Sequence, residues 1–176
     1  AFGLLLSVVA CEEPAVMEFA LPSGRSFNPD VEKQAILGVI ENETAAFFNR
    51  DYETWQQFFV QKDFAFQAWN NADGSFSASV GWAAVDKRIG DYIKSHPAPP
   101  GQSYYPRVER RNMVVKFFSD KLAYLVWDQY NSDQENKWFR RSKDQRIMEK
   151  VSGQWKIVNV SAYWDYNNKI PVDSLR

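Results

Sequence analysis

The chain has one cysteine, one histidine and no excess of either charge, and each shortage excludes a class of structure or function. A single cysteine, Cys11, cannot form an internal disulfide. With His96 as the one histidine, neither a zinc site nor a Ser-His-Asp triad is expected. Lys and Arg total 21 against 22 Asp and Glu, so the basic excess needed for nucleic-acid binding is missing. We therefore expect no metal, no cofactor and no nucleic-acid partner.

Aromatic residues, in contrast, are plentiful. The 176 residues fit one domain and include seven Trp, eight Tyr and thirteen Phe. That is more than a core of this size needs, so some of the rings should line a cavity or an interface.

The first ten positions form an apolar run, interrupted by Ser7, and a polar stretch follows Cys11 at once. A run of about ten residues is too short to span a bilayer but has the length of the hydrophobic part of a signal peptide. The tetrapeptide Val8-Val9-Ala10-Cys11 resembles a bacterial lipobox, which implies lipidation of Cys11 and a place in the bacterial cell envelope. The alternative is a buried first strand with a packed free cysteine. We predict a signal remnant at 1–11 and an unpatterned tether at 12–27.

The first half of the chain predicts helices and one pair of strands. Asn28 as N-cap and Pro29 at the first helical position begin a helix that runs to about Asn49. Asp51 can cap a second, short helix. Further along, the spacing of apolar and turn residues predicts strands at 63–70 and 75–79 and a helix at 81–95.

From residue 104 onward the chain predicts β-structure. Four long segments rich in β-branched and aromatic residues are separated by short turn sequences, at 107–118, 121–131, 137–151 and 154–166. Three short connections in succession imply an antiparallel meander, and the length of the strands favours a strongly bent sheet.

Several short motifs in this order resemble the nuclear transport factor 2-like (SnoaL-like) superfamily. Asn49-Arg50-Asp51-Tyr52-Glu53-Thr54-Trp55 looks like the junction between its first helices. Asp73-Gly74 and Gly81-Trp82 stand where its turn and its third-helix glycine fall, and 151–158 is similar to the hairpin into its last strand. The resemblance spans about residues 28–166, so we assign a domain to 28–168 and a tail to 169–176.

The resemblance implies an α+β fold of the cystatin-like kind. In this superfamily a strongly bent antiparallel sheet wraps around N-terminal helices and forms a cone with an internal pocket. Many members dimerise through the outer face of the sheet, so a homodimer is expected.

Strict alternation along the last strand divides its side chains between two faces. Because Lys156 looks exposed, the set that contains Asn159, Ser161 and Tyr163 should face the helices. Asn159 and Ser161 would then be polar groups on a mainly apolar inner wall and would contact protein, water or ligand. The other set would form the dimer face, namely Val158, Val160, Ala162 and Trp164.

Asp128 is the candidate acid–base group, because it lies late in a strand among apolar and aromatic neighbours. Inside a pocket, burial would raise its pKa and fit it for proton transfer. The alternative is a solvated aspartate on the outer face. Five aromatic residues are candidates for pocket walls, although each could equally belong to the core, and they are Tyr52, Trp55, Trp69, Trp127 and Tyr163.

Three functional hypotheses remain open at this point. The first is a lipid-anchored binding module whose aromatic pocket holds a small, mostly apolar molecule. The second is a cofactor-independent lyase, isomerase or hydrolase that uses Asp128, with Asn159 orienting the substrate. The third is an interaction subunit with a vestigial pocket. A titratable group facing the cavity favours the enzyme, an all-aromatic cavity favours binding, and a cavity filled by side chains favours the interaction subunit.

Overall fold

A computed structural model describes residues 27–97 and 105–175. The expected N-terminal signal remnant, the lipidated Cys11 and nearly all of the tether lie outside the described residues. In chain order the elements are α1 (Pro29–Phe48), α2 (Tyr52–Gln56), β1 (Phe66–Asn70), β2 (Phe76–Val80), α3 (Trp82–Val85), the π-helical turn η1 (Asp86–Gly90), α4 (Asp91–Ser95), β3 (Val108–Ser119), β4 (Leu122–Ser132), β5 (Trp138–Val151), β6 (Gln154–Trp164), β7 (Ile170–Pro171) and η2 (Val172–Ser174).

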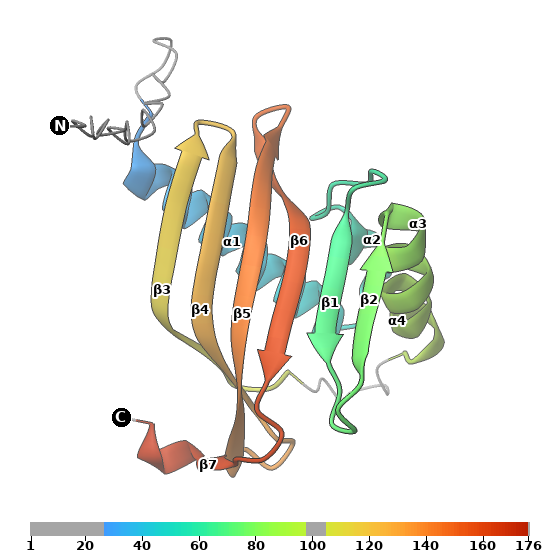
Figure 1. Ribbon diagram of the computed structural model, residues 1–176, viewed down its shortest axis with the longest axis vertical. Helices are drawn as coiled ribbons and strands as arrows, with labels where there is room; N and C mark the ends of the chain where they lie inside the picture. The colour runs from blue at the N-terminus through green and yellow to red at the C-terminus, as the bar shows by residue number, and fades with distance from the viewer. Residues whose placement is uncertain (1–26, 98–104, 176) are drawn as a thin grey trace, which may run out of the picture.

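The strands form one seven-stranded sheet in the order β2-β1-β6-β5-β4-β3, with β7 added beside β5. The predicted meander of four long strands is confirmed, since β3 to β6 pair antiparallel in sequence. One pairing differs from the prediction, because β1 runs parallel to β6. Figure 1 shows α1 crossing behind β3 to β6, with α3 and α4 beside β2. The fold is therefore the expected α+β arrangement of a sheet with helices on its inner face.

Helix α1 begins where its capping residues predict. The Asn28 side chain accepts hydrogen bonds from the backbone N–H groups of Asp30 (3.1 Å) and Val31 (3.3 Å), and Pro29 occupies the first turn. Ile36 and Ile40 are fully buried against the sheet. Three residues beyond Ile40, on the same side of the helix, the next position is Glu43 rather than an apolar residue. None of the helices in the described ranges is long and apolar enough to cross a membrane.

The last strand carries a β-bulge that reverses its facing. On β5, Ile147 pairs with Asn159 but Met148 pairs with Ile157, so Val158 is an extra residue on β6. Before the bulge Trp155 and Ile157 face the core, as predicted. After it the predicted facing is wrong, because the inner residues are Val160, Ala162 and Trp164, which line the main cavity. These three cannot form an outward dimer face.

The core lies between α1, the short helices and the inner face of the sheet. Its largest fully buried side chains include Trp55 and Trp127. A smaller cluster lies at the far end of the sheet, where Val172 packs against Tyr130 and Phe139. The segment predicted as a tail is therefore attached to the sheet, through β7 and this cluster.

Candidate functional site

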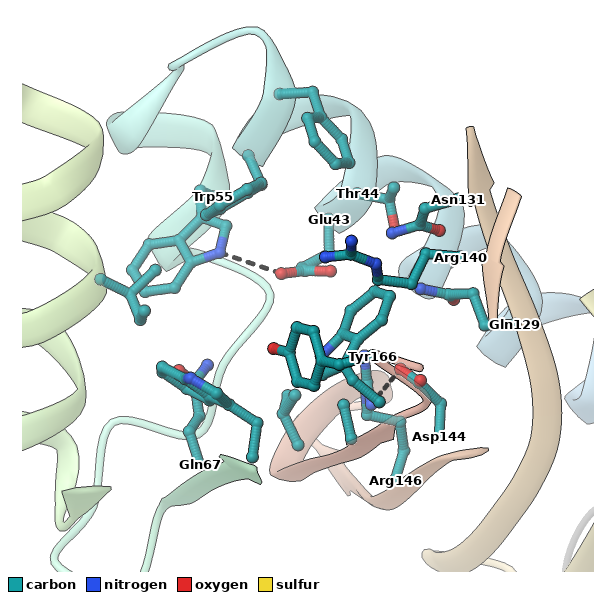
Figure 2. Close-up of a pocket in the computed structure, with 17 residues that line it drawn as sticks. Glu43, Thr44, Trp55, Gln67, Gln129, Asn131, Arg140, Asp144, Arg146 and Tyr166 are labelled. Carbon is teal, nitrogen blue, oxygen red and sulfur yellow. Dashed lines mark hydrogen bonds and ion pairs between the residues drawn. The ribbon is translucent and has the colours of Figure 1, made fainter. Parts of the chain in front are cut away.

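A cavity of about 450 Å³ opens between α1 and the inner face of the sheet (Figure 2). This size is in the usual range for a small-molecule site. One part of its wall is aromatic and comprises Phe47, Phe48, Trp55, Trp69 and Trp164. The polar part comprises Glu43, Thr44, Gln67, Gln129, Asn131, Arg140, Asp144, Arg146 and Tyr166.

Glu43 projects from α1 into this cavity, where the indole Nε1 of Trp55 donates a hydrogen bond to its carboxylate (3.0 Å). Burial raises the pKa of Glu43, and the nearby charge of Asp144 adds to this effect. The positive charges of Arg146 and Arg110 and the Trp55 hydrogen bond act in the opposite direction, but burial is the largest effect. Glu43 is thus a carboxyl group held in a poorly solvated place, with a raised affinity for a proton.

Opposite Glu43, on β5, lies a buried ion pair. Arg146 Nη1 is 3.3 Å from Asp144 Oδ2 and donates to the carbonyl oxygen of Gln145 (2.9 Å). The Ser142 hydroxyl donates to the other oxygen of Asp144. The Arg146 guanidinium lies over the Trp127 ring, 5.1 Å from its centroid. Its Nε is buried and finds no acceptor among the described residues.

Two amides on β4 complete the polar wall. Gln129 accepts a hydrogen bond from Trp127 Nε1 (3.2 Å) through its oxygen, which orients its NH₂ group as a donor. The Oδ1 of Asn131 is buried, and the described part of the chain offers it no donor. A buried carbonyl oxygen without a partner is costly to the folded state.

Arg140 and Tyr166 stand nearer the mouth. The guanidinium of Arg140 lies 5.0 Å from the centroid of the Tyr166 ring, and the Tyr166 hydroxyl donates to the carbonyl oxygen of Asn70 (3.2 Å). Figure 2 shows Arg140 reaching into the cavity from the β5 side.

Of the five aromatic residues predicted as pocket walls, Trp55 and Trp69 line the cavity. Trp127 is buried in the core beneath it. The Tyr52 hydroxyl donates to Asp86 (2.8 Å), and burial together with that carboxylate raises the Tyr52 pKa to about 12. Tyr163 is 58% exposed on the outer face.

Asn159 and Ser161 also lie on the outer side of the sheet, because the bulge in β6 turns them away from α1. Asn159 Nδ2 donates to the Ser161 hydroxyl (3.1 Å), so the two buried polar groups satisfy each other. The expectation that they face the helices is wrong, and the reason is the extra residue Val158.

The expectation that Asp128 faces the cavity with a raised pKa is also wrong. Asp128 is on the outer face, only 4% exposed, and is covered by the side chains that bind it. It accepts from Asn112 Nδ2 (2.9 Å) and contacts Lys143 Nζ (2.7 Å) and Arg141 Nη2 (2.8 Å). These hydrogen bonds hold the pKa of Asp128 well below its usual range, although burial opposes them. Asp128 therefore binds the cationic side chains of Arg141 and Lys143 and is not an acid–base candidate.

Three charged residues of the cavity were not predicted, although their positions in the sequence pattern distinguish them. Glu43 interrupts the apolar stripe of α1 at a core-facing position. Asp144 and Arg146 are separated from the buried Met148 by four and two positions, so all three lie on the inner face of β5. A charged residue in phase with core residues is the pattern that would have found them. As for metals, no three carboxylate, histidine or cysteine groups of the described ranges come together as a site.

The fold and cavity define an α+β class in which a bent sheet and helices enclose an internal pocket. No family model matches the chain, and no curated protein matches it. Solved structures do. A nuclear transport factor 2-like protein of unknown function from Shewanella oneidensis is 17% identical with a TM-score of 0.55, over 75% of this chain and 98% of that one.

Two further structures agree on the fold. A cystatin-like protein of unknown function from Nostoc punctiforme is 11% identical with a TM-score of 0.57, over 85% of this chain and 97% of that one. A candidate scytalone dehydratase from Novosphingobium aromaticivorans is 16% identical with a TM-score of 0.53, over 77% and 85% of the two chains. The chain therefore has the nuclear transport factor 2-like, or cystatin-like, fold.

Proposed function

We propose that the cavity binds a small, largely apolar and flat molecule, and that Glu43 transfers a proton to or from it without a cofactor. The observation that carries this proposal is the position of Glu43, whose carboxyl group reaches a cavity of about 450 Å³ and has a raised pKa. Perturbed carboxyl groups in a pocket are typical of general acid–base catalysts. The likeness to a candidate dehydratase adds only the shared fold.

The other groups fit roles around such a transfer. Removal of a proton from a carbon beside a carbonyl group moves the bonding electron pair to the carbonyl oxygen, while Glu43 gains the proton. The oxygen then needs a donor, which the NH₂ group of Gln129 can supply. The rings of Trp69 and Trp164 would hold the flat body of the ligand.

The test uses 2-tetralone, a flat bicyclic ketone with acidic protons beside its carbonyl group. In deuterated buffer, proton NMR measures how fast these protons exchange in the presence of the protein. We expect the wild type to accelerate exchange, with a rate that rises with pH as Glu43 ionises. Glu43→Gln should abolish the acceleration yet still bind tetralone, since glutamine keeps the acceptor for Trp55. Glu53→Gln, at an exposed position on α2, is the matched control and should behave as wild type.

Quenching of tryptophan fluorescence measures binding in the same samples, because Trp55, Trp69 and Trp164 line the cavity. Exchange that is equally fast in the wild type and in Glu43→Gln would contradict the catalytic role.

A binding module without chemistry is the second candidate. It is favoured by the observation that Glu43 and Asp144 both have protein partners already, in Trp55 and Arg146. In that case tetralone would quench the tryptophans of both proteins, but neither would accelerate exchange. A vestigial pocket fits less well, because side chains do not fill the cavity.

We further propose that the domain is carried in the bacterial cell envelope by a lipid on Cys11. The support is the apolar run that ends in Val8-Val9-Ala10-Cys11. In a bacterial host, globomycin or Cys11→Ala should cause an unprocessed precursor to accumulate. An unchanged mass and an unchanged membrane partition in both tests would refute the anchor.

A further inference from the structure

A second cavity, of about 320 Å³, lies next to the first at the ends of β4 and β5. Asn131, Arg140 and Trp164 line both cavities, so the two share a wall. Four residues of β5 are separated by even numbers of positions and therefore share its inner face, namely Arg146, Asp144, Arg140 and Trp138. The first three line the main cavity and the last lines the second, so a ligand could extend along β5 from one to the other.

The second cavity has an excess of positive charge. Its ionisable side chains are Arg140, Lys169 and Asp133. Asp133 is already engaged, since its Oδ1 accepts from the backbone N–H groups of Lys137 (2.7 Å) and Trp138 (3.3 Å). Among the described residues, no carboxylate lies within ion-pair distance of Arg140 or Lys169. By contrast, Arg146 is paired with Asp144.

The C-terminal segment builds this cavity and positions Lys169. The Asp165 carboxylate accepts from the backbone N–H groups of Asn167 (3.1 Å) and Asn168 (3.2 Å), which forms the turn just before Lys169. Directly after it, β7 pairs with β5 at Trp138. The ring of Tyr166 lies beneath the guanidinium of Arg140 and limits its movement. The two cations therefore line the same cavity, with Arg140 stacked on Tyr166 and Lys169 between an ordered turn and β7.

We propose that the natural ligand is an elongated amphipathic acid. Its apolar body occupies the main cavity, and its terminal carboxylate binds Arg140 and Lys169 in the second cavity. The planar guanidinium of Arg140 suits a carboxylate, because it can donate two parallel hydrogen bonds. Asn131 lines both cavities and would lie beside the middle of such a molecule. This inference rests on the proposed ligand-binding role of the main cavity.

The test compares two probes that differ only in their end group, 4-(2-naphthyl)butanoate and 4-(2-naphthyl)butan-1-ol. Tryptophan quenching gives the dissociation constant of each. We expect the wild type to bind the carboxylate about tenfold more tightly than the alcohol, the effect of one charge-assisted hydrogen bond. Arg140→Gln should remove this preference, because it should weaken binding of the carboxylate far more than binding of the alcohol. Lys169→Gln should reduce the preference in part.

The matched control is Lys116→Gln, an exposed lysine of β3 on the outer side of the sheet, which should keep the full preference. Equal affinity of the wild type for both probes would overturn the acid site while leaving the main cavity intact. A preference lost in Arg146→Gln but kept in Arg140→Gln would also overturn it, because the carboxylate would then bind in the main cavity. If neither probe binds and 2-tetralone does not bind either, the proposed function itself fails.

Discussion

Glu43, on α1, and Asp128, on β4, are both carboxylic acids, and their surroundings shift their pKa values in opposite directions. Burial in the cavity wall dominates at Glu43 and raises its pKa. At Asp128 the side chains of Asn112, Lys143 and Arg141 dominate and lower it. The difference depends on facing: Glu43 points into a poorly solvated cavity where Trp55 donates to it, while Asp128 lies under charged and amide donors that neighbouring strands present.

The raised pKa of Glu43 makes the stability of the protein depend on pH. The folded state binds the proton of Glu43 more tightly than the unfolded state does. The stabilisation is therefore present below the unfolded pKa and is lost as pH rises through the folded pKa. Glu43→Gln never ionises, so its melting temperature should exceed that of the wild type at pH 8 and the gain should vanish near pH 4. Glu53→Gln, at an exposed position on α2, controls for the substitution itself. Thermal melts at pH 4 and pH 8 measure the difference in melting temperature. A difference that is the same at both pH values would contradict a raised pKa at Glu43.

For Asp128 the sign is reversed. Its folded pKa is lowered, so its ion pairs stabilise the protein above the unfolded pKa, and this contribution is lost as pH falls through the folded pKa. Asp128→Asn should cost about 1.5–3 kcal/mol at pH 7, the range for hydrogen bonds to a charged group. The deficit should shrink as the pH falls below about 4. Chemical denaturation at pH 7 and pH 3 measures both values. A variant as stable as the wild type at pH 7 would show that the pairs contribute nothing.

Individual helices and strands could be predicted from the sequence where local chemistry determines them. The cap of α1 and the four long strands need only their own residues and turns. The parallel contact of β1 with β6 and the bulge at Val158 could not be predicted. Val158 and Val160 are both apolar, so the sequence pattern carries no mark of the extra residue, and the shift appears only when β6 is aligned with β5. This single shift explains why Asn159 and Ser161 were assigned to the wrong face.

The reversed facing of β6 leads to a direct test. Ala162 now lines the cavity, whereas Tyr163 beside it points outward. Ala162→Phe should place a ring in the cavity and weaken binding of 4-(2-naphthyl)butan-1-ol at least about tenfold, because it removes space that the naphthyl group needs. Tyr163→Phe should bind the alcohol as the wild type does. Quenching titrations measure both, and undiminished binding to Ala162→Phe would mean that the strand faces as strict alternation predicts.

At the scale of the whole molecule, the order of elements was sufficient to predict the fold but not the site. Chain order and turn chemistry predicted the meander of four long strands, and the resemblance to the nuclear transport factor 2-like superfamily implied the helices on its inner face. The site depends on which way each strand faces and on contacts between distant segments, such as Trp55 with Glu43. Those contacts are set by the packing of α1 against the sheet, and neither helix nor strand specifies them alone.

The outer face of the sheet leads to a prediction about assembly. Exposed apolar side chains lie on it at Val114, Ile147 and Tyr163, from three different strands, and α1 covers only the opposite face. Apolar groups gathered on an uncovered sheet face are typical of an interface, and a twofold axis would let two copies bury the same surface. We therefore expect residues 28–176 to form a homodimer in light scattering at tens of micromolar.

Ile147→Glu should give a monomer, because it places a charge within the buried surface. Val31→Glu is the matched control, since Val31 is also apolar and exposed but lies on α1, and it should leave the dimer intact. A monomeric wild type, or a dimer that survives Ile147→Glu, would show that this face stays in solvent.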